Sequence, residues 1–226
     1  TDNPAPPPKP TPTPTPKNVN LYDLMTAYRR RCTGPLVKLL AAQLGVRPET
    51  LLSLRVGYDG RNYAFPMRSG RGRIIGIKLR APNGRKFCVR GSRLGIYWPA
   101  SVSPRDCGDL YICEGESDCA ALLSMGLDAI GRPSCTGGVE IIKAFLSQGC
   151  RDVYIVADKD PPKKRPDGSL WRPGIDGAFR LAQEIKSFVS GVCVLTPPKN
   201  KDVRQWYNDG ATKAAVQCVA ESARWL

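Results

Sequence analysis

Carboxylates follow short apolar runs at three places in the chain. Each run is typical of a strand buried in a sheet. The carboxylates are Glu114 after the first run, Asp158 and Asp160 after the second, and Asp202 a few residues beyond the third. In an open parallel sheet, the carboxyl ends of the strands line one edge, where ligands bind. We expect these carboxylates to meet there. Because like charges repel unless a cation neutralises them, hard oxygen ligands in such a cluster favour Mg²⁺ or Mn²⁺.

Other kinds of site are disfavoured. The chain contains no histidine, which rules out Ser-His-Asp and Cys-His catalysis within it. Its 9 cysteines include no Cys-x-x-Cys pair, so we expect no zinc in this chain. The odd number and scattered positions favour a reducing cytosol over a disulfide framework. No apolar run is long enough to span a membrane, and the N-terminus lacks the pattern of a signal peptide. We therefore expect a cytoplasmic protein with no membrane partner.

Positive charge is concentrated in one half of the chain. Residues 21–105 carry 17 Lys and Arg against 3 Asp and Glu, whereas residues 106–226 carry 15 against 16. The first half is therefore strongly basic, and the second is nearly neutral and holds the carboxylates. This asymmetry indicates a polyanion-binding module joined to a metal-dependent catalytic module.

The sequence pattern divides the chain into three parts. Residues 1–20 are rich in proline and predict an extended linker that packs no core. Residues 21–105 predict helices up to Gly45 and then a small antiparallel sheet, with a hairpin turn at Asn83-Gly84. In residues 106–226, strands alternate with helices, which predicts a parallel sheet with flanking helices. The fold class is thus α/β, preceded by a small basic α+β subdomain.

The motifs of the second half resemble those of a known family. A strand ending in Glu-Gly-x-x-Asp, followed by Asp-x-Asp after a later strand, is similar to the toprim fold of primases, topoisomerases and some nucleases. The Lys201-Asp202 step after the last strand resembles the primase branch. Residues 61–98 resemble the basic subdomain that precedes toprim in phage- and plasmid-type primases. The resemblance therefore identifies the chain as similar to the catalytic core of a toprim DNA primase.

The resemblance implies a function and roles for individual residues. The activity would be synthesis of short RNA primers on single-stranded DNA by Mg-dependent nucleotidyl transfer. Glu114 would be a metal ligand or general acid/base, and Asp158, Asp160 and Asp202 would hold the metal. Asp118 matches the family motif and would support the site. The residues expected to bind template phosphates and ribonucleoside triphosphates are Arg73, Lys78, Arg80, Lys86, Arg90 and Arg93.

The resemblance also implies partners and a cellular setting. These are a replicative helicase and a zinc-binding domain upstream of the Pro-rich tract, in bacterial, phage or mobile-element replication. Two alternatives stay open beside the primase. One is a toprim nuclease, and the other is a catalytically inactive module that binds single-stranded nucleic acid.

Three features depart from the family pattern or have a plainer interpretation. Lys159 stands between the two aspartates, where an extended backbone would point it away from the metal. Residues 161–172 lengthen the following loop with basic residues and a tryptophan. They are either a solvated insertion or a contact to nucleic acid through charge and stacking. Glu116, at the start of a helix, is expected to interact with the helix dipole rather than to act in catalysis.

Overall fold

The computed structural model describes residues 20–106, 108–149, 152–223 and 225–226. The Pro-rich tract, expected to be an extended linker, lies outside these residues, apart from Asn20, as do Cys107 and Cys150. None of the described helices is long and apolar enough to cross a membrane. The described cysteines are all free thiols.

The basic part begins with three helices, α1 (Leu21–Arg31), α2 (Gly34–Leu44) and α3 (Pro48–Ser53). The side chain of Asn20 caps α1 by accepting from the backbone N–H of Tyr22. Pro35 stands in the first turn of α2, and Gly45 ends that helix in the left-handed conformation, with φ of 67°. The end of the helical region predicted at Gly45 is thereby confirmed for α2.

An antiparallel sheet of four strands follows these helices. The strands lie in the order of the chain: β1 (Gly57–Tyr58), β2 (Tyr63–Arg68), β3 (Ile74–Arg80) and β4 (Lys86–Cys88). The turn between β3 and β4 contains Gly84 with φ of 83°, as the Asn-Gly signal predicts. Helix α1 covers one face of the sheet, where Met25 packs on Ile77 and Leu79. We call this sheet the basic sheet.

A second, parallel sheet forms the other half of the molecule. Its strands are β5 (Asp109–Glu114), β6 (Ala129–Arg132), β7 (Asp152–Val156) and β10 (Gly191–Leu195), in the order β10-β7-β5-β6. The connection that follows β5 leads to β6 on one side, whereas the connection that follows the adjacent strand β7 leads to β10 on the other side. This is a topological switch point, and in such sheets the crevice beyond the carboxyl ends of the strands binds ligands.

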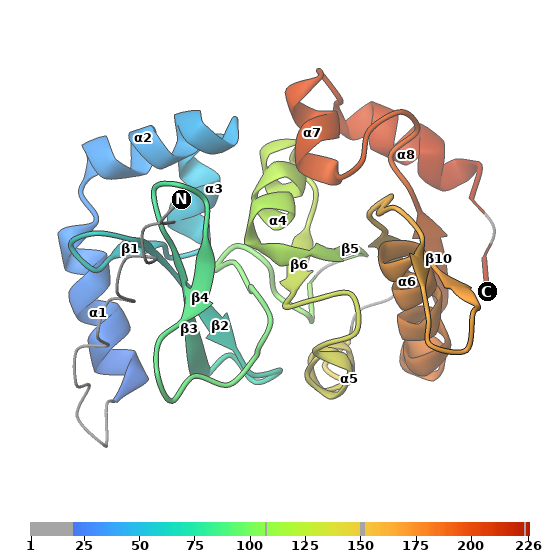
Figure 1. Ribbon diagram of the computed structural model, residues 1–226, viewed down its shortest axis with the longest axis horizontal. Helices are drawn as coiled ribbons and strands as arrows, with labels where there is room; N and C mark the ends of the chain where they lie inside the picture. Colours follow the sequence, from blue (N-terminus) through green and yellow to red (C-terminus); the bar gives the residue numbers. More distant parts are fainter. Residues whose placement is uncertain (1–19, 107, 150–151, 224) are drawn as a thin grey trace, which may run out of the picture.

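Helices cover both faces of the parallel sheet, as Figure 1 shows. Helix α4 (Gly115–Ser124) packs against α7 (Val203–Asn208), and α8 (Lys213–Glu221) packs on β10. On the other face, α5 (Val139–Leu146) packs against α6 (Pro173–Ile185), which a short 3-10 turn extends over Lys186–Phe188. The predicted α/β fold with a parallel sheet and flanking helices is confirmed.

The loop between β7 and α6 contains structure that the sequence pattern did not predict. Its strands, β8 (Lys163–Lys164) and β9 (Leu170–Trp171), pair antiparallel with Lys163 opposite Trp171. Helix α7 was also not predicted, because it is short and lies between two loops. The remaining predicted strands and helices of this half all form, with ends shifted by a few residues.

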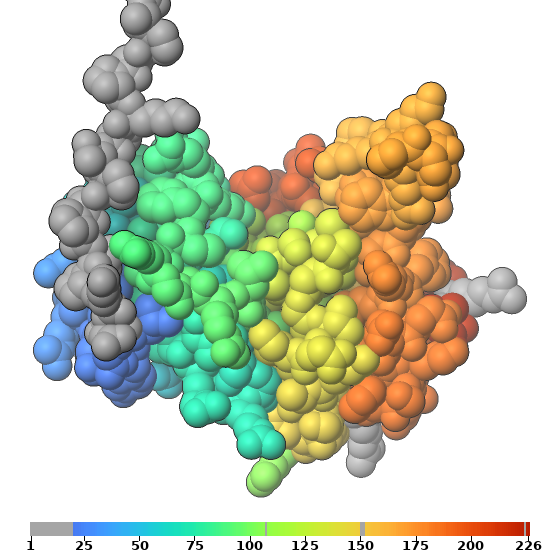
Figure 2. Space-filling model, turned by 60° about the horizontal axis from the view of Figure 1, so that its bottom comes forward, coloured from blue at the N-terminus to red at the C-terminus, as the bar shows by residue number. Residues whose placement is uncertain are grey.

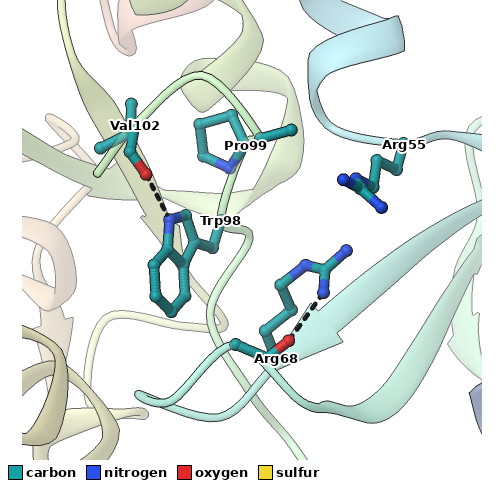
Figure 3. Close-up of a pocket in the computed structure, with 7 residues that line it drawn as sticks. Arg55, Arg68, Trp98, Pro99 and Val102 are labelled. Atoms are coloured by element: carbon teal, nitrogen blue, oxygen red, sulfur yellow. Dashed lines mark hydrogen bonds between the residues drawn. The ribbon is translucent and has the colours of Figure 1, made fainter. Parts of the chain in front are cut away.

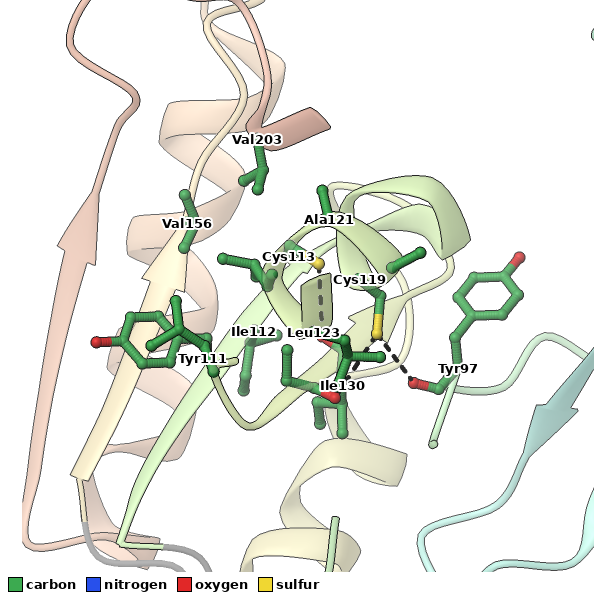
Figure 4. Packing of buried hydrophobic residues seen from close by; sticks show 14 of the residues in the cluster. Tyr97, Tyr111, Ile112, Cys113, Cys119, Ala121, Leu123, Ile130, Val156 and Val203 are labelled. Atoms are coloured by element: carbon green, nitrogen blue, oxygen red, sulfur yellow. Dashed lines mark hydrogen bonds between the residues drawn. The ribbon is translucent and has the colours of Figure 1, made fainter. Parts of the chain in front are cut away.

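One hydrophobic core runs through both halves. It includes Leu40 of α2 and Leu51 of α3 together with Leu122 of α4. Figure 4 shows the part around β5 and α4, where Cys113 and Cys119 are fully buried. The Cys119 thiol donates to the carbonyl oxygens of Tyr97 and Ala129, so the sulfur also joins the segment before residue 105 to the parallel sheet. The core is therefore continuous across the boundary expected near residue 105.

Candidate active site

A cavity of about 400 Å³ lies where the carboxyl ends of β5 and β7 face the basic sheet. Carboxylates and cations both line it, and three of the cations come from the basic sheet. The acidic residues are Glu114, Glu116, Asp118, Asp158 and Asp202, and the basic residues are Lys78, Arg80, Lys86 and Arg204. The switch point of the parallel sheet thus coincides with the place where the two halves of opposite charge character meet.

Glu114 is the last residue of β5 and stands directly before α4. The turn into the helix passes through Gly115 in the left-handed conformation, with φ of 85°. Burial raises the pKa of the Glu114 carboxyl, and the nearby guanidinium of Arg132 opposes this rise. The Glu114 Oε2 atom is buried and accepts no hydrogen bond from any described residue.

Asp158 follows the end of β7 and lies beside Glu114. Burial raises the pKa of its carboxyl to about 8, and the charges of Asp118, Glu114 and Asp202 add to the rise. Its Oδ1 atom is buried without a hydrogen-bond partner among the described residues. Asp160 contributes to the rise in pKa as well. A half-buried carboxylate that is crowded by other carboxylates and lacks a donor is unfavourable unless a cation or a proton neutralises it.

Asp118 and Asp202 are held by helix ends. Asp118, in the first turn of α4, accepts from the backbone N–H of Arg204 at 2.9 Å. Burial and the charge of Asp202 nevertheless raise its pKa to about 6. Asp202 caps α7 by accepting from the backbone N–H of Gln205 at 2.8 Å. Helix α7 therefore positions two carboxylates, one by its cap and one by a backbone donor.

Asp160 takes a different position from the other predicted ligands. Its Oδ1 forms an ion pair with Lys201 Nζ at 3.1 Å, and the residue does not line the cavity. Lys159 is directed to the loop after β10, where its Nζ donates to the carbonyl of Pro198 at 2.6 Å. The expectation that Lys159 points away from the ligands agrees with this contact. Of the four predicted metal ligands, Glu114, Asp158 and Asp202 share the cavity.

The carboxylates fit a hard divalent cation as a partial ligand set. Among the described residues, no group of three or more acidic, cysteine or histidine side chains is arranged to hold a metal ion alone. Glu114 Oε2 and Asp158 Oδ1 are buried oxygens with free lone pairs. Mg²⁺ is usually bound by one or two carboxylates together with substrate phosphates, so two such oxygens suit a site that a nucleotide completes.

The six predicted nucleic-acid-binding residues separate into two groups. Lys78, Arg80 and Lys86 line the cavity. They share one face of the basic sheet, because Lys78 and Arg80 are two residues apart on β3 and Arg80 pairs with Lys86 in register. The other three, Arg73, Arg90 and Arg93, are exposed elsewhere on the basic part and do not line the cavity.

Glu116 binds the basic sheet. Its side chain is 1% exposed, and its Oε1 forms ion pairs with Lys86 Nζ at 2.7 Å and with Arg80 Nη1 at 3.4 Å. Helix α4 is therefore tied to β3 and β4 by buried charge. The sequence analysis expected Glu116 to interact only with the helix dipole. It did not predict the ion pairs, because a sequence does not reveal which cations of another sheet will face a carboxylate.

Arg132 is a residue of the site that the sequence pattern did not single out. It ends β6, opposite Glu114 in register, and its side chain is almost fully buried. Nη1 donates to the carbonyls of Cys135 and Gly177, at 2.8 and 3.2 Å. It thereby ties the loop after β6 to the start of α6. The sequence signal that could have identified Arg132 is a charged residue at the end of an apolar strand.

A second cationic cavity, of about 240 Å³, lies beside the loop between β2 and β3 (Figure 3). It is lined by Arg55, Arg68 and the ring of Trp98. Burial lowers the pKa of Arg68, and the nearby charges of Arg55 and Arg29 lower it further. Arg55 has φ of 57°, a left-handed conformation that is uncommon for residues other than glycine. This cavity adds to the positive field of the basic half.

Comparisons with known proteins were made by sequence and by structure. No family model matches the sequence, and no curated protein matches it. Solved structures do match. The E. coli primase catalytic core has a TM-score of 0.67 at 16% identity, over 90% of this chain and 79% of that chain. A DnaG primase catalytic domain bound to ssDNA also gives 0.67 at 16% identity, over 90% and 77%.

More distant likeness extends to a phage protein. The primase fragment of the bacteriophage T7 primase-helicase has a TM-score of 0.55 at 13% identity, over 79% of this chain and 72% of that chain. The chain thus has the fold of DnaG primase catalytic cores, toprim sheet included. The resemblance drawn from the sequence motifs is confirmed at the level of the fold.

Proposed function

We propose that this chain is the catalytic core of a DNA primase, which joins ribonucleotides on a single-stranded DNA template. The observation that carries the proposal is the cavity at the switch point. It sets two half-buried carboxylates, each with one buried oxygen that has no partner among the described residues, opposite three cations, within a fold shared with primase cores. Anionic oxygens for a divalent cation and cations for a triphosphate are the two requirements of nucleotidyl transfer.

The carboxylate side would hold the metal through Glu114 and Asp158, with Asp118 and Asp202 beside them. When bound, Mg²⁺ or Mn²⁺ would supply positive charge to the triphosphate oxygens and increase the acidity of the attacking hydroxyl. Glu114, whose pKa is raised by burial, can also hold a proton at Oε2. Arg132 keeps the Glu114 carboxyl from becoming still less acidic.

The cationic side would bind the triphosphate. Lys78 has no ion-pair partner among the described residues, so its ammonium is available to an incoming phosphate. Arg80 and Lys86 also face the cavity, but each already contacts Glu116. They would therefore bind phosphate while remaining anchored to α4. Arg204 is placed to contribute from the α7 side.

The test is incubation of the full chain with ribonucleoside triphosphates, Mg²⁺ and single-stranded DNA, with detection of labelled oligoribonucleotides. We expect short products from the native sequence and their loss in Asp158→Asn. The matched control is Asp128→Asn, because Asp128 is exposed at the opposite end of β6.

The same experiment addresses the alternatives. Shortening of the DNA without ribonucleotide products would identify a toprim nuclease instead. DNA binding without either reaction would indicate an inactive single-strand-binding module. Products that persist in Asp158→Asn would contradict the assignment of the carboxylate cavity.

A further inference from the structure

The loop from β7 to α6 is unusually long for its position. Connections between strand and helix in such folds typically have about 2 to 6 residues, whereas this one runs from residue 157 to residue 172. It leaves the sheet directly at Asp158 and contains the β8–β9 hairpin. The hairpin therefore follows Asp158, a residue of the carboxylate cavity, closely in the sequence.

The hairpin is ordered by its own backbone and not by packing. Arg165 N–H donates to the carbonyl of Ser169 at 2.8 Å, and Gly168 N–H donates to the carbonyl of Arg165 at 2.9 Å. All residues from 161 to 170 are exposed, and Leu170 is 70% exposed. A two-stranded hairpin that buries so little contributes little to stability. Its exposed residues are therefore free to contact a partner.

The hairpin carries more positive than negative charge. Its basic residues are Lys163, Lys164, Arg165 and, at its base, Arg172. The one acid of the turn, Asp167, accepts from the backbone N–H and hydroxyl of Ser169. Asp176, at the base, accepts from the backbone and guanidinium of Arg172. Both carboxylates thus stabilise the local structure. The side chains of Lys163, Lys164 and Arg165 remain available to bind a polyanion.

A cavity of about 290 Å³ lies beneath the hairpin. It is lined by the ring of Trp171, by Arg165 and Arg180, by Thr136, and by Asp176 and Gly177 in the first turns of α6. The carboxylate of Asp176 is paired with Arg172. The Arg165 guanidinium carbon lies 5.7 Å from the centre of the Trp171 ring. The indole offers a stacking surface for a base, and the guanidinium groups of Arg165 and Arg180 in the same cavity offer donors for phosphates.

This cavity is next to the candidate active site. Pro133 lines the carboxylate cavity and Thr136 lines the hairpin cavity, so the loop after β6 forms a wall of both. Figure 2 shows a hollow between the β3–β4 hairpin, in green, and the lobe that includes the β8–β9 hairpin, in orange. The loop after β6, in yellow, lies between them. A strand that occupies the hollow would contact both hairpins.

We propose that the β8–β9 hairpin is a contact site for single-stranded nucleic acid, in which a base stacks on Trp171 and phosphates meet Arg165 and Arg180. The site would form the wall opposite the basic sheet and hold a nucleotide adjacent to the one in the carboxylate cavity. The inference rests on the proposed function only in one respect, namely that the chain binds single-stranded nucleic acid. The alternative is that the hairpin is a solvated insertion that contacts no nucleic acid, and the experiment below distinguishes the two.

The experiment measures binding of fluorescent (dT)12 and (rU)12 to the full chain by anisotropy. We expect Trp171→Ala to weaken binding of at least one oligonucleotide by about fivefold or more, the effect of losing one stacking aromatic. Trp171→Phe should retain most of the affinity, because phenylalanine also stacks. The matched control is Leu170→Ala, since neighbouring residues of a strand point to opposite faces. It should bind like the native chain.

Salt titration separates stacking from charge. Trp171→Ala should leave the slope of log K against log salt unchanged, whereas Arg165→Ala should reduce it. The oligonucleotide that loses more affinity identifies whether template DNA or the RNA strand occupies the site. Thermal melting confirms that each variant is folded. If Trp171→Ala is misfolded, the affinity and salt slope of Arg165→Ala decide the question.

Native affinity in both Trp171→Ala and Arg165→Ala would overturn the inference. That result combined with primer synthesis by the native chain would leave the proposed function intact. Loss of affinity in Trp171→Ala, without primer synthesis by the native chain, would support the hairpin site and reject the primase.

Discussion

Asp158 is the residue whose replacement tests the charge of the cavity most directly. Partial burial, together with the charges of the neighbouring carboxylates, raises the pKa of its carboxyl to about 8. The same environment that would favour a divalent cation opposes folding when no cation is present. Catalytic sites commonly combine these two properties, since ligands arranged for a bound ion repel one another without it.

The metal-free protein should therefore lose stability as the pH rises. The ordinary pKa of 3.8 applies to Asp158 in the unfolded chain, and the folded pKa is about 8. Between these values the unfolded chain releases a proton that the folded chain keeps, so the free energy of unfolding falls from about pH 4 to about pH 8. Asp158→Asn should make the fall shallower and be more stable than the native chain at pH 8.

Urea unfolding across this pH range, with a chelator present, is the measurement. Asp128→Asn, outside the cavity, should keep the native profile. Some pH dependence should remain in Asp158→Asn, because the pKa of Asp118 is also raised, to about 6. Lower stability of Asp158→Asn at pH 8 would show that the Asp158 carboxylate is stabilised by contacts other than a bound cation.

Helix α4 is the element that joins the two sides of the cavity. It begins at the end of β5, places Asp118 over the cavity, and anchors the basic sheet through Glu116. Its far end contacts α3, where Ser124 Oγ accepts from the backbone N–H of Arg47 at 3.0 Å. One short helix thus sets the distance between the carboxylates and the cations.

Replacement of Glu116 tests this anchoring. Glu116→Gln should destabilise the protein by about 1–3 kcal/mol, less than the roughly 3–5 kcal/mol typical of a broken buried pair, because Lys86 is partly exposed. The control is Glu140→Gln, since the Glu140 side chain is 83% exposed beside Lys143. It should change stability little. Equal stabilities of the two variants, measured by denaturant unfolding, would mean that α4 and the basic sheet are held by apolar packing alone.

The elements differ in how well the sequence predicts them. Strands β5, β7 and β10 are apolar runs with carboxylates behind them, so their existence and the meeting of Glu114 and Asp158 could be predicted. The β8–β9 hairpin could not, because strands of two exposed residues carry no hydrophobic period. The ion pair of Asp160 with Lys201 also depends on how two loops meet in space. Sequence spacing places both aspartates at the strand end but does not distinguish them.

At the scale of the whole molecule, cations of the basic half line two cavities. The basic half faces the carboxylate half across a cavity, and the second cationic cavity at Arg55 and Arg68 lies elsewhere on the same half. We expect the basic half to supply most of the affinity for single-stranded DNA, and that affinity to fall steeply with salt.

Lys78 gives the most direct measure of this contribution. Lys78→Ala should weaken binding of single-stranded DNA and reduce the slope of log K against log salt by about 0.7, the value for one phosphate contact. Lys38→Ala, an exposed lysine on α2 that does not line the cavity, is the control of equal charge. Anisotropy at several salt concentrations provides both slopes. If the two variants had the same slope, net charge rather than the cavity would determine the salt dependence.

The continuous core has a consequence for the thermodynamics of ligand binding. The apolar side chains of α2, α3 and α4 pack as one body, and a pair of backbone hydrogen bonds joins Tyr97 to Gly131. The two walls of the cavity are therefore placed by folding and not by the ligand. A triphosphate that enters does not have to bring the walls together, so less of its binding free energy is spent on ordering the protein. The site is preorganised, and the cost of that arrangement is included in the stability of the fold.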